Sequence, residues 1–455
     1  MDRGESRRAN DRGGQIVLRP EWVWTPEGLR SHHAVRIGSG IIVEVGPAER
    51  YPSIDVDLPG RLLLPGLVNA HSHAFQRAFR GHVQHRPRGR DDFWSWRDRM
   101  YGVANALSPE GVQAVSALAF LEMMEAGITR VGEFHYLHHQ PDGTPYADPD
   151  ELAHRVRAAA DEVGLGITLL RVAYQRAGAG QPLRDDQRRF GDADPEQVLA
   201  ALERLAARGD VGLAPHSVRA LDADYLRALS AWGGAVHAHV SEQPAENEAC
   251  VEEHGRSPLA LLSDCGLVGP GFTAVHLTHP MAGDVDRLVA ADATICVCPS
   301  TELDLGDGFL PVEARLGARL CLGSDSHAWI DLLREATTLE MHARGVAGRR
   351  NVLTPEGDRH GLAEALLHAA TTAGSRALGR DDRGIVAGAP ADLVALDLRR
   401  TAALGVPPLE AAALVASADW VDQVWVAGEP HLVDGRHPRA EGVRRRAAAH
   451  LGQVQ

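Results

Sequence analysis

The chain has 455 residues, of which 44% are hydrophobic and 24% are charged, and its net charge is −14. A chain of this length holds either one large barrel-type domain with an accessory domain or two to three ordinary domains. The negative charge argues against a nucleic-acid surface, and no run of about 18 apolar residues predicts a membrane span. All 47 basic residues are arginines, which excludes every mechanism that needs a lysine, among them a carboxylated lysine bridging two metal ions.

The N-terminal segment is polar. Residues 1–14, MDRGESRRANDRGG, have no apolar core and therefore do not read as a secretory signal, so we expect a disordered leader there. Residues 15–64 contain short apolar stretches separated by turn residues, such as QIVLRPEWVW and GIIVEVGP. This pattern predicts short β-strands.

Residues 65–384 alternate apolar runs with amphipathic helical stretches. One helical stretch runs from Ser108 to Gly127 and another from Asp194 to Gly209, each with a proline directly after its capping residue. Eight apolar runs in and just before this segment are strand-like: RLLLPGLVNAHSH, GITRVGEFHY, GLGITLLRVAY, DVGLAPHSV, GAVHAHVSE, GFTAVHLTH, DATICVCPS and ARLCLGSDSH. Eight such strand–helix units predict an α/β fold, a closed parallel (β/α)₈ TIM barrel.

The strand pattern of the N-terminal flank returns after the barrel segment. Residues 385–440 contain the stretches IVAGAPADLVALDL and DQVWVAGEPHLVDG. Because two β-rich flanks bracket the barrel, we expect residues 15–64 and 385–440 to pair into one small β-sandwich domain. The arginine- and alanine-rich residues 441–455 are expected to form a C-terminal tail.

Five cysteines are an odd number and have no metal-site spacing: Cys250, Cys265, Cys296, Cys298 and Cys321. Cys296 and Cys298 lie in an apolar strand-like run, which favours buried free thiols. We therefore predict a reducing, cytoplasmic location.

Polar residues gather where the predicted strands end. In chain order these are His71–Ser72–His73, Glu133–Phe134–His135–Tyr136, His216–Ser217, the stretch from His237 to Glu242, His276–Leu277–Thr278–His279, and Ser324–Asp325–Ser326–His327. The carboxyl ends of barrel strands form one face, which carries the active site in barrels of this kind. The pattern predicts a histidine-rich site on that face.

Histidine nitrogens together with a carboxylate oxygen are typical ligands of catalytic zinc. His71 and His73 point to the same side of their strand because they lie two residues apart. Asp325 and one fifth-strand histidine, either His237 or His239, would complete four ligands. Metal-bound water has a pKa of roughly 7 and is therefore a nucleophile at neutral pH.

A carboxylate near such a water can move its proton to the leaving nitrogen. Glu242, three residues after His239, suits that role.

The residues at these strand ends resemble the amidohydrolase superfamily, and the resemblance covers essentially the whole chain. It implies a TIM barrel of the metal-dependent hydrolase type. Within the superfamily, several stretches resemble the formiminoglutamate deiminases of histidine degradation: NAHSHAFQRAFRG, FWSWRDRMY, GEFHYLHH, APHSVRA, HAHVSEQ and CPSTELDLGDG. The last stretch departs from the family pattern at Ser300, Leu303 and Asp304.

The resemblance implies one zinc ion with four ligands: His71, His73, His239 and Asp325. His239 is preferred to His237 because its spacing to Glu242 matches the HxxE pattern of the family. Another divalent metal such as iron is the alternative to zinc.

The same resemblance implies hydrolytic deimination, which yields N-formyl-L-glutamate and ammonia. His276 would polarise the attacking water, with His279 as the alternative, and Asp325 would accept its proton. Glu242 would protonate the departing nitrogen.

The implied substrate, N-formimino-L-glutamate, has two carboxylates and a cationic formamidine, and carboxylates favour arginine partners. Five residues match the substrate-contacting positions of the family: Gln76, Arg97, Tyr136, His216 and Arg219. The acidic residues Glu302 and Asp307, after strand 7, would either meet the formamidine or cap their loop.

Other interpretations stay open on the sequence. Arg97 could be a solvated loop charge or pair with Asp92 or Asp98, and Tyr136 could simply pack. The enzyme could deaminate a cyclic substrate such as a purine or pterin, which favours aromatic and amide contacts over two arginines. A non-catalytic barrel is a third interpretation, although such proteins usually lose metal ligands. We expect a dicarboxylate as the partner, no nucleic acid or membrane, and a homodimer as one oligomeric option.

Overall fold

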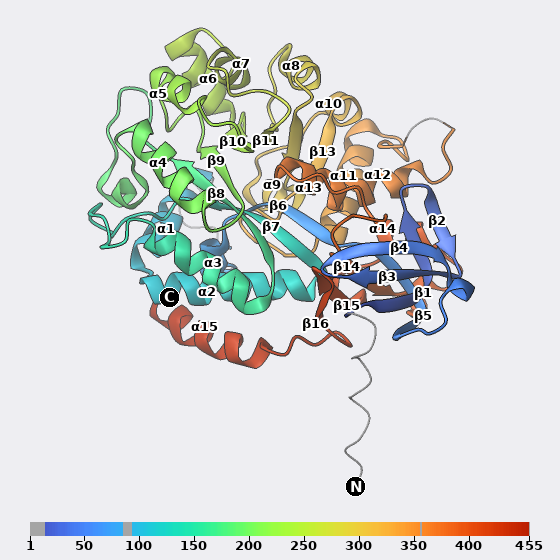
Figure 1. Ribbon diagram of the computed structural model, residues 1–455. Coiled ribbons are helices and arrows are strands. Elements are labelled where there is room, and N and C mark those ends of the chain that lie inside the picture. The colour runs from blue at the N-terminus through green and yellow to red at the C-terminus, as the bar shows by residue number, and fades with distance from the viewer. Residues whose placement is uncertain (1–13, 85–92, 355–356, 455) are drawn as a thin grey trace.

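The computed structural model describes residues 14–84, 93–354 and 357–454. It shows a helix-covered barrel with a second sheet beside it (Figure 1). All but the last residue of the predicted leader, 1–14, lies outside the described residues. Among the helices of the described ranges, none is both long and apolar enough to cross a membrane. All five cysteines are free and buried, as predicted.

Eight parallel strands form the barrel, and each pairs with the next along the chain. They are β6 (Leu67–Ser72), β7 (Ile128–His135), β8 (Gly166–Ala173), β9 (Val211–Pro215), β10 (Val236–Val240), β11 (Phe272–His276), β12 (Thr294–Val297) and β13 (Arg319–Leu322). Strands β10, β11 and β12 are buried at every position because helices cover them outside and side chains fill the interior. The predicted (β/α)₈ barrel is confirmed.

The barrel closes between its first and last strands at the residues of the predicted metal site. Ser72 forms an isolated parallel bridge with Asp325. The backbone N–H groups of Ser324 and Asp325 donate to the carbonyl oxygen of His71 over 3.1 and 3.0 Å, and the N–H of His73 donates to that of Asp325 over 3.1 Å. The hydrogen bonds that close the sheet therefore also hold these residues side by side.

Helices follow the strands and surround the barrel (Figure 1). They are α1 (Phe93–Ala106), α2 (Pro109–Glu125), α3 (Glu151–Val163), α4 (Pro195–Ala206), α5 (Ala223–Leu229), α6 (Pro244–His254), α7 (Pro258–Asp264), α8 (Asp284–Ala290), α9 (Pro299–Leu305), α10 (Val312–Gly317), α11 (Leu332–Ala347), α12 (Gly361–Ala370) and α13 (Thr372–Ala377). The predicted cap of α2 is confirmed, since Ser108 Oγ accepts from the N–H of Gly111 over 3.1 Å. Helix α4 ends at Ala206, three residues before the predicted Gly209.

Strands from both chain ends form one mixed sheet. From edge to edge its order is β16 (Glu429–Leu432), β15 (Val421–Val426), β14 (Leu393–Asp397), β5 (Val56–Pro65), β1 (Ile16–Thr25), β3 (His33–Gly38) and β4 (Ile41–Pro47), with β2 (Gly28–Ser31) paired to β1. The C-terminal strand β14 pairs antiparallel with the N-terminal strand β5. A small β-domain built from both ends is therefore present, as predicted.

The apolar run RLLLPGLVNAHSH, predicted as one strand, is divided between the two sheets. Leu63 of β5 packs in the core of the mixed sheet, whereas Leu62 and Leu64 pack in the barrel core. The first part of the run is continuously apolar because the last four residues of β5, Leu62–Pro65, are all buried. Gly66 separates β5 from β6, and a Cβ there would lie 2.1 Å from Thr129 Oγ1, so the close approach requires glycine.

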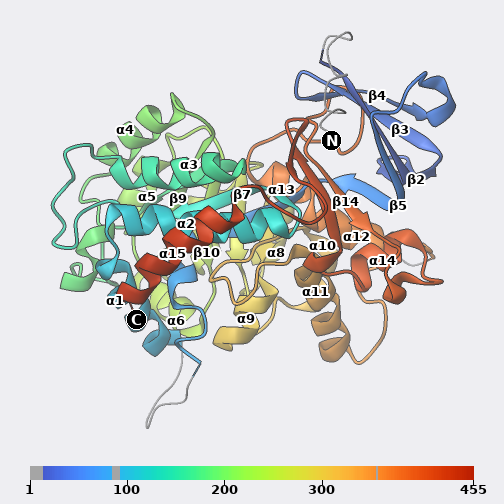
Figure 2. The ribbon, with the colours of Figure 1, turned by 90° about the horizontal axis from the view of Figure 1, so that it is seen from below.

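Two further helices complete the C-terminal part, α14 (Pro408–Leu414) and α15 (Ala440–Val454). The predicted tail is thus helical in its described part, and α15 lies along α2 (Figure 2). Val443 and Ala447 are buried, and Arg444 Nη2 lies 2.7 Å from Glu125 Oε1. Because these two apolar residues lie four positions apart, they form one buried face of the helix, which the arginine- and alanine-rich composition of the segment does not reveal.

Candidate metal and substrate site

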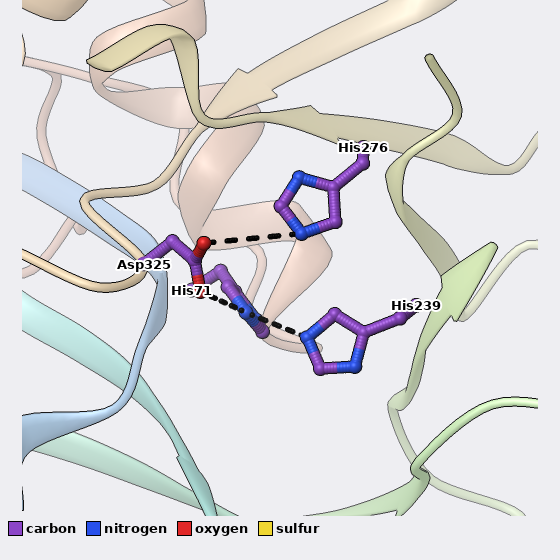
Figure 3. A group of neighbouring side chains, drawn as sticks. All are labelled: His71, His239, His276 and Asp325. Atoms are coloured by element: carbon purple, nitrogen blue, oxygen red, sulfur yellow. Dashed lines mark hydrogen bonds and ion pairs between the residues drawn. The ribbon is translucent and has the colours of Figure 1, made fainter. Parts of the chain in front are cut away.

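Four buried side chains bring ligand atoms together at the carboxyl ends of the barrel strands. One ligand atom each from His71 (β6), His239 (β10), His276 (β11) and Asp325 (after β13) lies within 4.8 Å of the others (Figure 3). These four residues come from strands spread over 255 positions of the chain, so only barrel closure brings them together.

His73 contacts the same carboxylate as His71. Its Nε2 lies 3.1 Å from Asp325 Oδ1, and the Nε2 of His71 lies 3.2 Å from that oxygen. The structure therefore brings the predicted ligands His71, His239 and Asp325 together with His276, and the predicted ligand His73 adjoins this cluster through Asp325.

The two fifth-strand histidines have different surroundings. The Nε2 of His239 lies 3.2 Å from the Nε2 of His71. His237 lies two residues earlier on β10, and its Nε2 is 2.8 Å from the carbonyl oxygen of Ala377 in α13. The structure brings His239, and not His237, to the cluster.

The two sixth-strand histidines also differ. The Nε2 of His276 lies 3.7 Å from Glu242 Oε1 and 3.9 Å from Asp325 Oδ2. His279 instead contacts the backbone carbonyl oxygen of Asp307 through its Nε2, over 2.6 Å. His276 is therefore the one that faces the cluster.

His276 lies between carboxylates on both sides of its ring. Its Nδ1 lies 3.5 Å from Glu302 Oε1, which also accepts from the N–H of Cys298 over 2.9 Å. Burial favours the neutral ring, but the hydrogen bond with Glu302 and the charges of Glu242 and Asp325 outweigh it and raise the pKa of His276 to about 10. The surrounding carboxylates therefore favour the protonated form of this imidazole.

Hydrogen bonds of the other imidazoles indicate which nitrogens face a bound cation. The Nδ1 atoms of His73 and His239 each lie 3.0 Å from a backbone carbonyl oxygen. A carbonyl oxygen only accepts, so each Nδ1 carries a hydrogen, and each Nε2 of a neutral ring presents a lone pair. Burial favours the neutral rings of His71 and His239: it lowers the pKa of His71 to about 3 and that of His239 well below its usual value.

These lone pairs converge with the carboxylate of Asp325, which is repulsive unless a cation lies between them. Imidazole nitrogens with one carboxylate are the donor set of catalytic zinc. The residues present therefore fit a divalent metal ion.

Backbone strain is concentrated at the same strand ends. The φ angle is +49° at Ser241, +69° at His276, +42° at Asp325 and +63° at His327. Residues other than glycine adopt such angles at a cost of roughly 1–3 kcal/mol each. Strain of this kind is typical of sites where the fold aims functional side chains.

A cavity adjoins the cluster, and all five predicted substrate-contacting residues line it: Gln76, Arg97, Tyr136, His216 and Arg219. His239 and Asp325 of the cluster line it as well, together with their neighbours His73 and Glu242. The predicted metal site and the predicted substrate site are thus one continuous site.

Arg219 is buried and contacts two carboxylates. Its Nη2 donates to Glu242 Oε2 over 2.9 Å, and its Nε lies 3.7 Å from Glu246 Oε2. Burial opposes the positive charge, but Glu246 and Glu242 outweigh it and raise the pKa of Arg219. Its Nη1 is buried without a hydrogen-bond partner and is available to a ligand.

Arg97 lies against an aromatic side chain of the cavity. Its guanidinium carbon is 5.7 Å from the ring centre of Tyr101, and its Nε is buried without a hydrogen-bond partner. Asp98, one of its alternative partners, pairs with Arg184 over 2.9 Å. Asp92, the other alternative, lies outside the described residues.

The remaining predicted contacts form short hydrogen-bonded groups. Gln76 Nε2 donates to the hydroxyl of Tyr136 over 2.9 Å, and the amide oxygen of Gln76 is buried without a partner. Tyr136 therefore packs and also orients Gln76. The Nδ1 of His216 lies 3.1 Å from Ser217 Oγ, and burial lowers the pKa of His216 well below its usual value.

The two acidic residues of the strand-7 loop do not line the cavity. Glu302 contacts His276, whereas Asp307 Oδ1 accepts from the amide of Gln243. Burial and the charge of Glu242 raise the pKa of Asp307 to about 9. Neither residue is therefore placed to meet the formamidine of a substrate bound in this cavity.

Sequence reasoning missed a hydrogen-bond chain beneath the HxH motif. Glu133 accepts from Ser72 Oγ over 2.6 Å and from the N–H of Ala74 over 2.7 Å. Ser72 Oγ lies 3.3 Å from His327 Nε2, and the Nδ1 of that ring lies 3.0 Å from Ser324 Oγ. The chain joins β6, β7 and the end of β13. The sequence shows these residues as polar residues at strand ends, but which of them pair depends on how the barrel closes.

Aromatic residues were also missed as part of the cavity wall. They are Phe93, Trp96, Tyr101 and Tyr174. Three of them come from the stretch FWSWRDRMY, in which only Arg97 was assigned a role.

Comparisons with known proteins identify relatives of this chain. Residues 62–430 match the model of the amidohydrolase family. The formimidoylglutamate deiminase of Pseudomonas aeruginosa is 36% identical over 451 residues, covering 94% of this chain and 97% of that protein. The 8-oxoguanine deaminase of the same organism is 29% identical over 448 residues, with 92% and 94% covered.

Among solved structures, an amidohydrolase from Brucella melitensis has a TM-score of 0.89 and 34% identity, over 97% of this chain and 99% of that one. An adenosine deaminase from Xanthomonas campestris with bound zinc has a TM-score of 0.82 over 96% and 98% of the two chains. At 24% identity, the latter demonstrates a shared fold alone.

Proposed function

This chain belongs to the amidohydrolase family, and from that premise we propose that it hydrolyses N-formimino-L-glutamate to N-formyl-L-glutamate and ammonia. The observation that carries the proposal is the shared cavity, because Arg97 and Arg219 line it together with the histidine–aspartate cluster. Two guanidinium groups on one wall suit a dicarboxylate. The 36% identity to a formimidoylglutamate deiminase supports the same substrate.

For the cofactor we propose one zinc ion, held by His71, His73, His239 and Asp325, with iron as the alternative. When bound, such an ion lowers the pKa of water to roughly 7 and so supplies a nucleophile at neutral pH. The support is the convergence of neutral imidazole lone pairs on the Asp325 carboxylate.

We assign the proton transfers to residues in and beside the cluster. We assign to Asp325 the acceptance of the proton of the attacking water, and the support is its Oδ2, which faces His276. His276 would orient that water and stabilise negative charge that develops on it. Glu242 lines the cavity and contacts His276, so we assign it the protonation of the departing nitrogen. The hydroxyl proton of the tetrahedral carbon would pass through Glu242 to the departing nitrogen, so that the C–N bond breaks and ammonia leaves, while Asp325 keeps the proton taken from the water.

At the other end of the cavity the substrate carboxylates would bind to Arg97 and to the free Nη1 of Arg219. Gln76 would add its unpartnered amide oxygen, which suits an N–H of the substrate. Tyr136 and His216 would close the remaining walls. Such a site distinguishes a linear dicarboxylate from an uncharged ring by its charge.

A second candidate function is favoured by the aromatic wall of the same cavity. Phe93, Trp96, Tyr101, Tyr136 and Tyr174 offer stacking surfaces for a ring. A relative with 29% identity is an 8-oxoguanine deaminase. Deamination of a purine or pterin is therefore the alternative against which the proposal is tested.

The test is ammonia release from N-formimino-L-glutamate by the zinc-loaded protein and by its R97A variant. We expect R97A to lower kcat/KM roughly 100-fold, because a charged bidentate contact to the substrate is lost. R184A is the matched control, since Arg184 lies 5.3 Å from the ring of Tyr101 but outside the cavity lining. This exposed arginine should change kcat/KM by less than about threefold.

Two results would contradict the proposal. The first is that the metal-loaded protein releases no ammonia from N-formimino-L-glutamate. The second is that R97A has full activity while a purine or pterin is deaminated, which would establish the ring substrate.

We also propose that the enzyme is cytoplasmic. The support is its five buried, free cysteines, which match a reducing compartment. Fractionation of cells that produce the protein would test this location.

A further inference from the structure

Arg219 has two carboxylate neighbours that differ in their exposure to the cavity. Glu242 lines the cavity, whereas Glu246, at 1% exposure, lies behind it in the first turn of α6. The Nη2 of Arg219 donates to Glu242 over 2.9 Å, and its Nε lies 3.7 Å from Glu246. One guanidinium is thus shared between a carboxylate assigned to catalysis and one that no ligand in this cavity can reach.

Glu246 is held in place by the backbone next to it. Its Oε2 accepts from the N–H of Glu242 over 3.3 Å, while its Oε1 is buried without a hydrogen-bond partner. Arg219 is the one cation paired with it in the described part of the chain. A buried carboxylate with an unpartnered oxygen is costly, so its presence points to a role that requires its charge.

The arrangement creates a competition for Arg219. In this structure Glu242 Oε2 is occupied by the guanidinium, and its other oxygen faces His276. A carboxylate needed for proton transfer must have an oxygen free to meet the substrate. A substrate carboxylate that binds the free Nη1 of Arg219 and forms a bidentate contact would compete with Glu242 for the neighbouring Nη2.

We propose that Glu246 is a positioning residue that keeps Arg219 in place when the substrate carboxylate displaces Glu242 from it. Binding of the carboxylate would thereby release Glu242 for its proton transfer. The inference rests on the proposed function, because it takes the substrate to be a carboxylate. It explains why one guanidinium has two buried carboxylate partners.

Removal of the Glu246 charge has opposite effects on binding and turnover. With one negative charge fewer beside Arg219, a free carboxylate would bind more tightly. Glu242 would then be the remaining counter-ion of Arg219 and would be released less readily, so kcat would fall. A residue with a merely structural role would weaken binding and turnover together.

The experiment uses the full-length, zinc-loaded protein and its E246Q variant. Binding of L-glutamate, a dicarboxylate without the reacting formimino group, is measured by calorimetry, and turnover is measured by ammonia release. We expect E246Q to bind L-glutamate roughly tenfold more tightly, and to show a kcat about tenfold lower with a lower KM. E246D, which keeps the charge, should restore both values toward those of the wild type.

E253Q is the matched control. Glu253 lies on the same helix seven residues later and pairs with Arg176 over 2.7 Å, and among the described residues no ion pair joins it to Arg219. Its neutralisation removes a neighbouring ion pair of α6 and should leave kcat and glutamate affinity unchanged.

Several outcomes would overturn the inference. They are weaker or unchanged glutamate binding by E246Q, equal effects of E246Q and E253Q, or no glutamate binding by the wild type. If E246Q does not fold, E246A, which also removes the charge, serves in its place, and no change in its kcat or affinity would contradict the inference. If the wild type binds glutamate but releases no ammonia, the proposed function fails, whereas the effect of Glu246 on affinity still decides this inference.

Discussion

His237 and His239 are identical side chains two residues apart on β10, and their neighbours alone distinguish them. His237 is bound to the carbonyl oxygen of Ala377, whereas His239 meets His71. Both point into the barrel because strand residues i and i+2 share a face. The difference is one of depth, since the residue nearer the strand's carboxyl end reaches the site.

We therefore expect H239N and H237N to behave differently. H239N should lose bound metal and at least about 10³-fold in activity, because the nucleophile is no longer generated at neutral pH. H237N should keep its metal. Loss of a buried hydrogen bond should lower its free energy of unfolding by about 1–3 kcal/mol, and its melting temperature should fall accordingly. Metal analysis and thermal unfolding of both variants check this. Loss of metal from H237N alone would reverse the assignment.

Helices α9 and α11 are joined through a buried acid. Glu335 of α11 accepts from the N–H of Ser300, at the start of α9, over 2.9 Å. Helix α9 carries Glu302, which contacts His276, so this link positions part of the site. Burial raises the pKa of Glu335 from 4.5 to about 8. The folded protein therefore holds a proton there that the unfolded chain releases near pH 4.5.

This difference makes stability depend on pH in a definite direction. The contribution of a group whose folded pKa is raised is fully present below pH 4.5 and is lost as the pH rises to about 8. E335Q cannot ionise, so its stability relative to the wild type should increase across this window, by about 5 kcal/mol at most. Chemical denaturation between pH 5 and pH 9 measures the difference.

E340Q is the control on the same helix. Glu340 pairs with Arg344 over 2.7 Å and accepts from two backbone N–H groups, so its neutralisation should destabilise the protein. A constant difference between E335Q and the wild type from pH 5 to pH 9 would show that Glu335 does not titrate in this range.

Strand β5 of the mixed sheet packs Leu62 and Leu64 into the barrel core, and the barrel closes through residues of the metal site. Hydrogen bonds between the backbones of His71, His73, Ser324 and Asp325 complete the sheet. The same segment carries strained φ angles and converging lone pairs. A metal ion at this point would therefore stabilise the closure of the fold as well as activate water.

Removal of metal should lower both activity and stability. A ligand present at about 1,000 times its dissociation constant adds roughly 4 kcal/mol to stability. We expect chelator-treated protein to lose ammonia release and to melt at a lower temperature, and zinc to restore both. H239N provides the control, since its melting temperature should not respond to zinc. Equal melting of the treated and untreated wild type would contradict the link between the site and closure.

Much of the architecture was predictable because local patterns are strong in this chain. Eight apolar runs between capped helices specify a barrel, and paired β-rich flanks specify a shared domain. The start of α2 was predictable from Ser108 and Pro109, because a cap is a local interaction. The division at Gly66 was not predictable, because two successive apolar strands look the same in the sequence as one long strand.

The sequence alone determined which residue types stand at the strand ends, since a pattern of apolar runs followed by histidines and acids is local. It excluded lysine chemistry and specified the family by resemblance. Only the tertiary structure decided which of these residues meet. Three sets of contacts join parts of the chain that are distant in sequence. They are the pairing of Arg219 with Glu242 and Glu246, the contact of His237 with Ala377, and the hydrogen-bond chain from Glu133 to His327. Such contacts depend on how the barrel closes, and closure is a long-range event that no local pattern encodes.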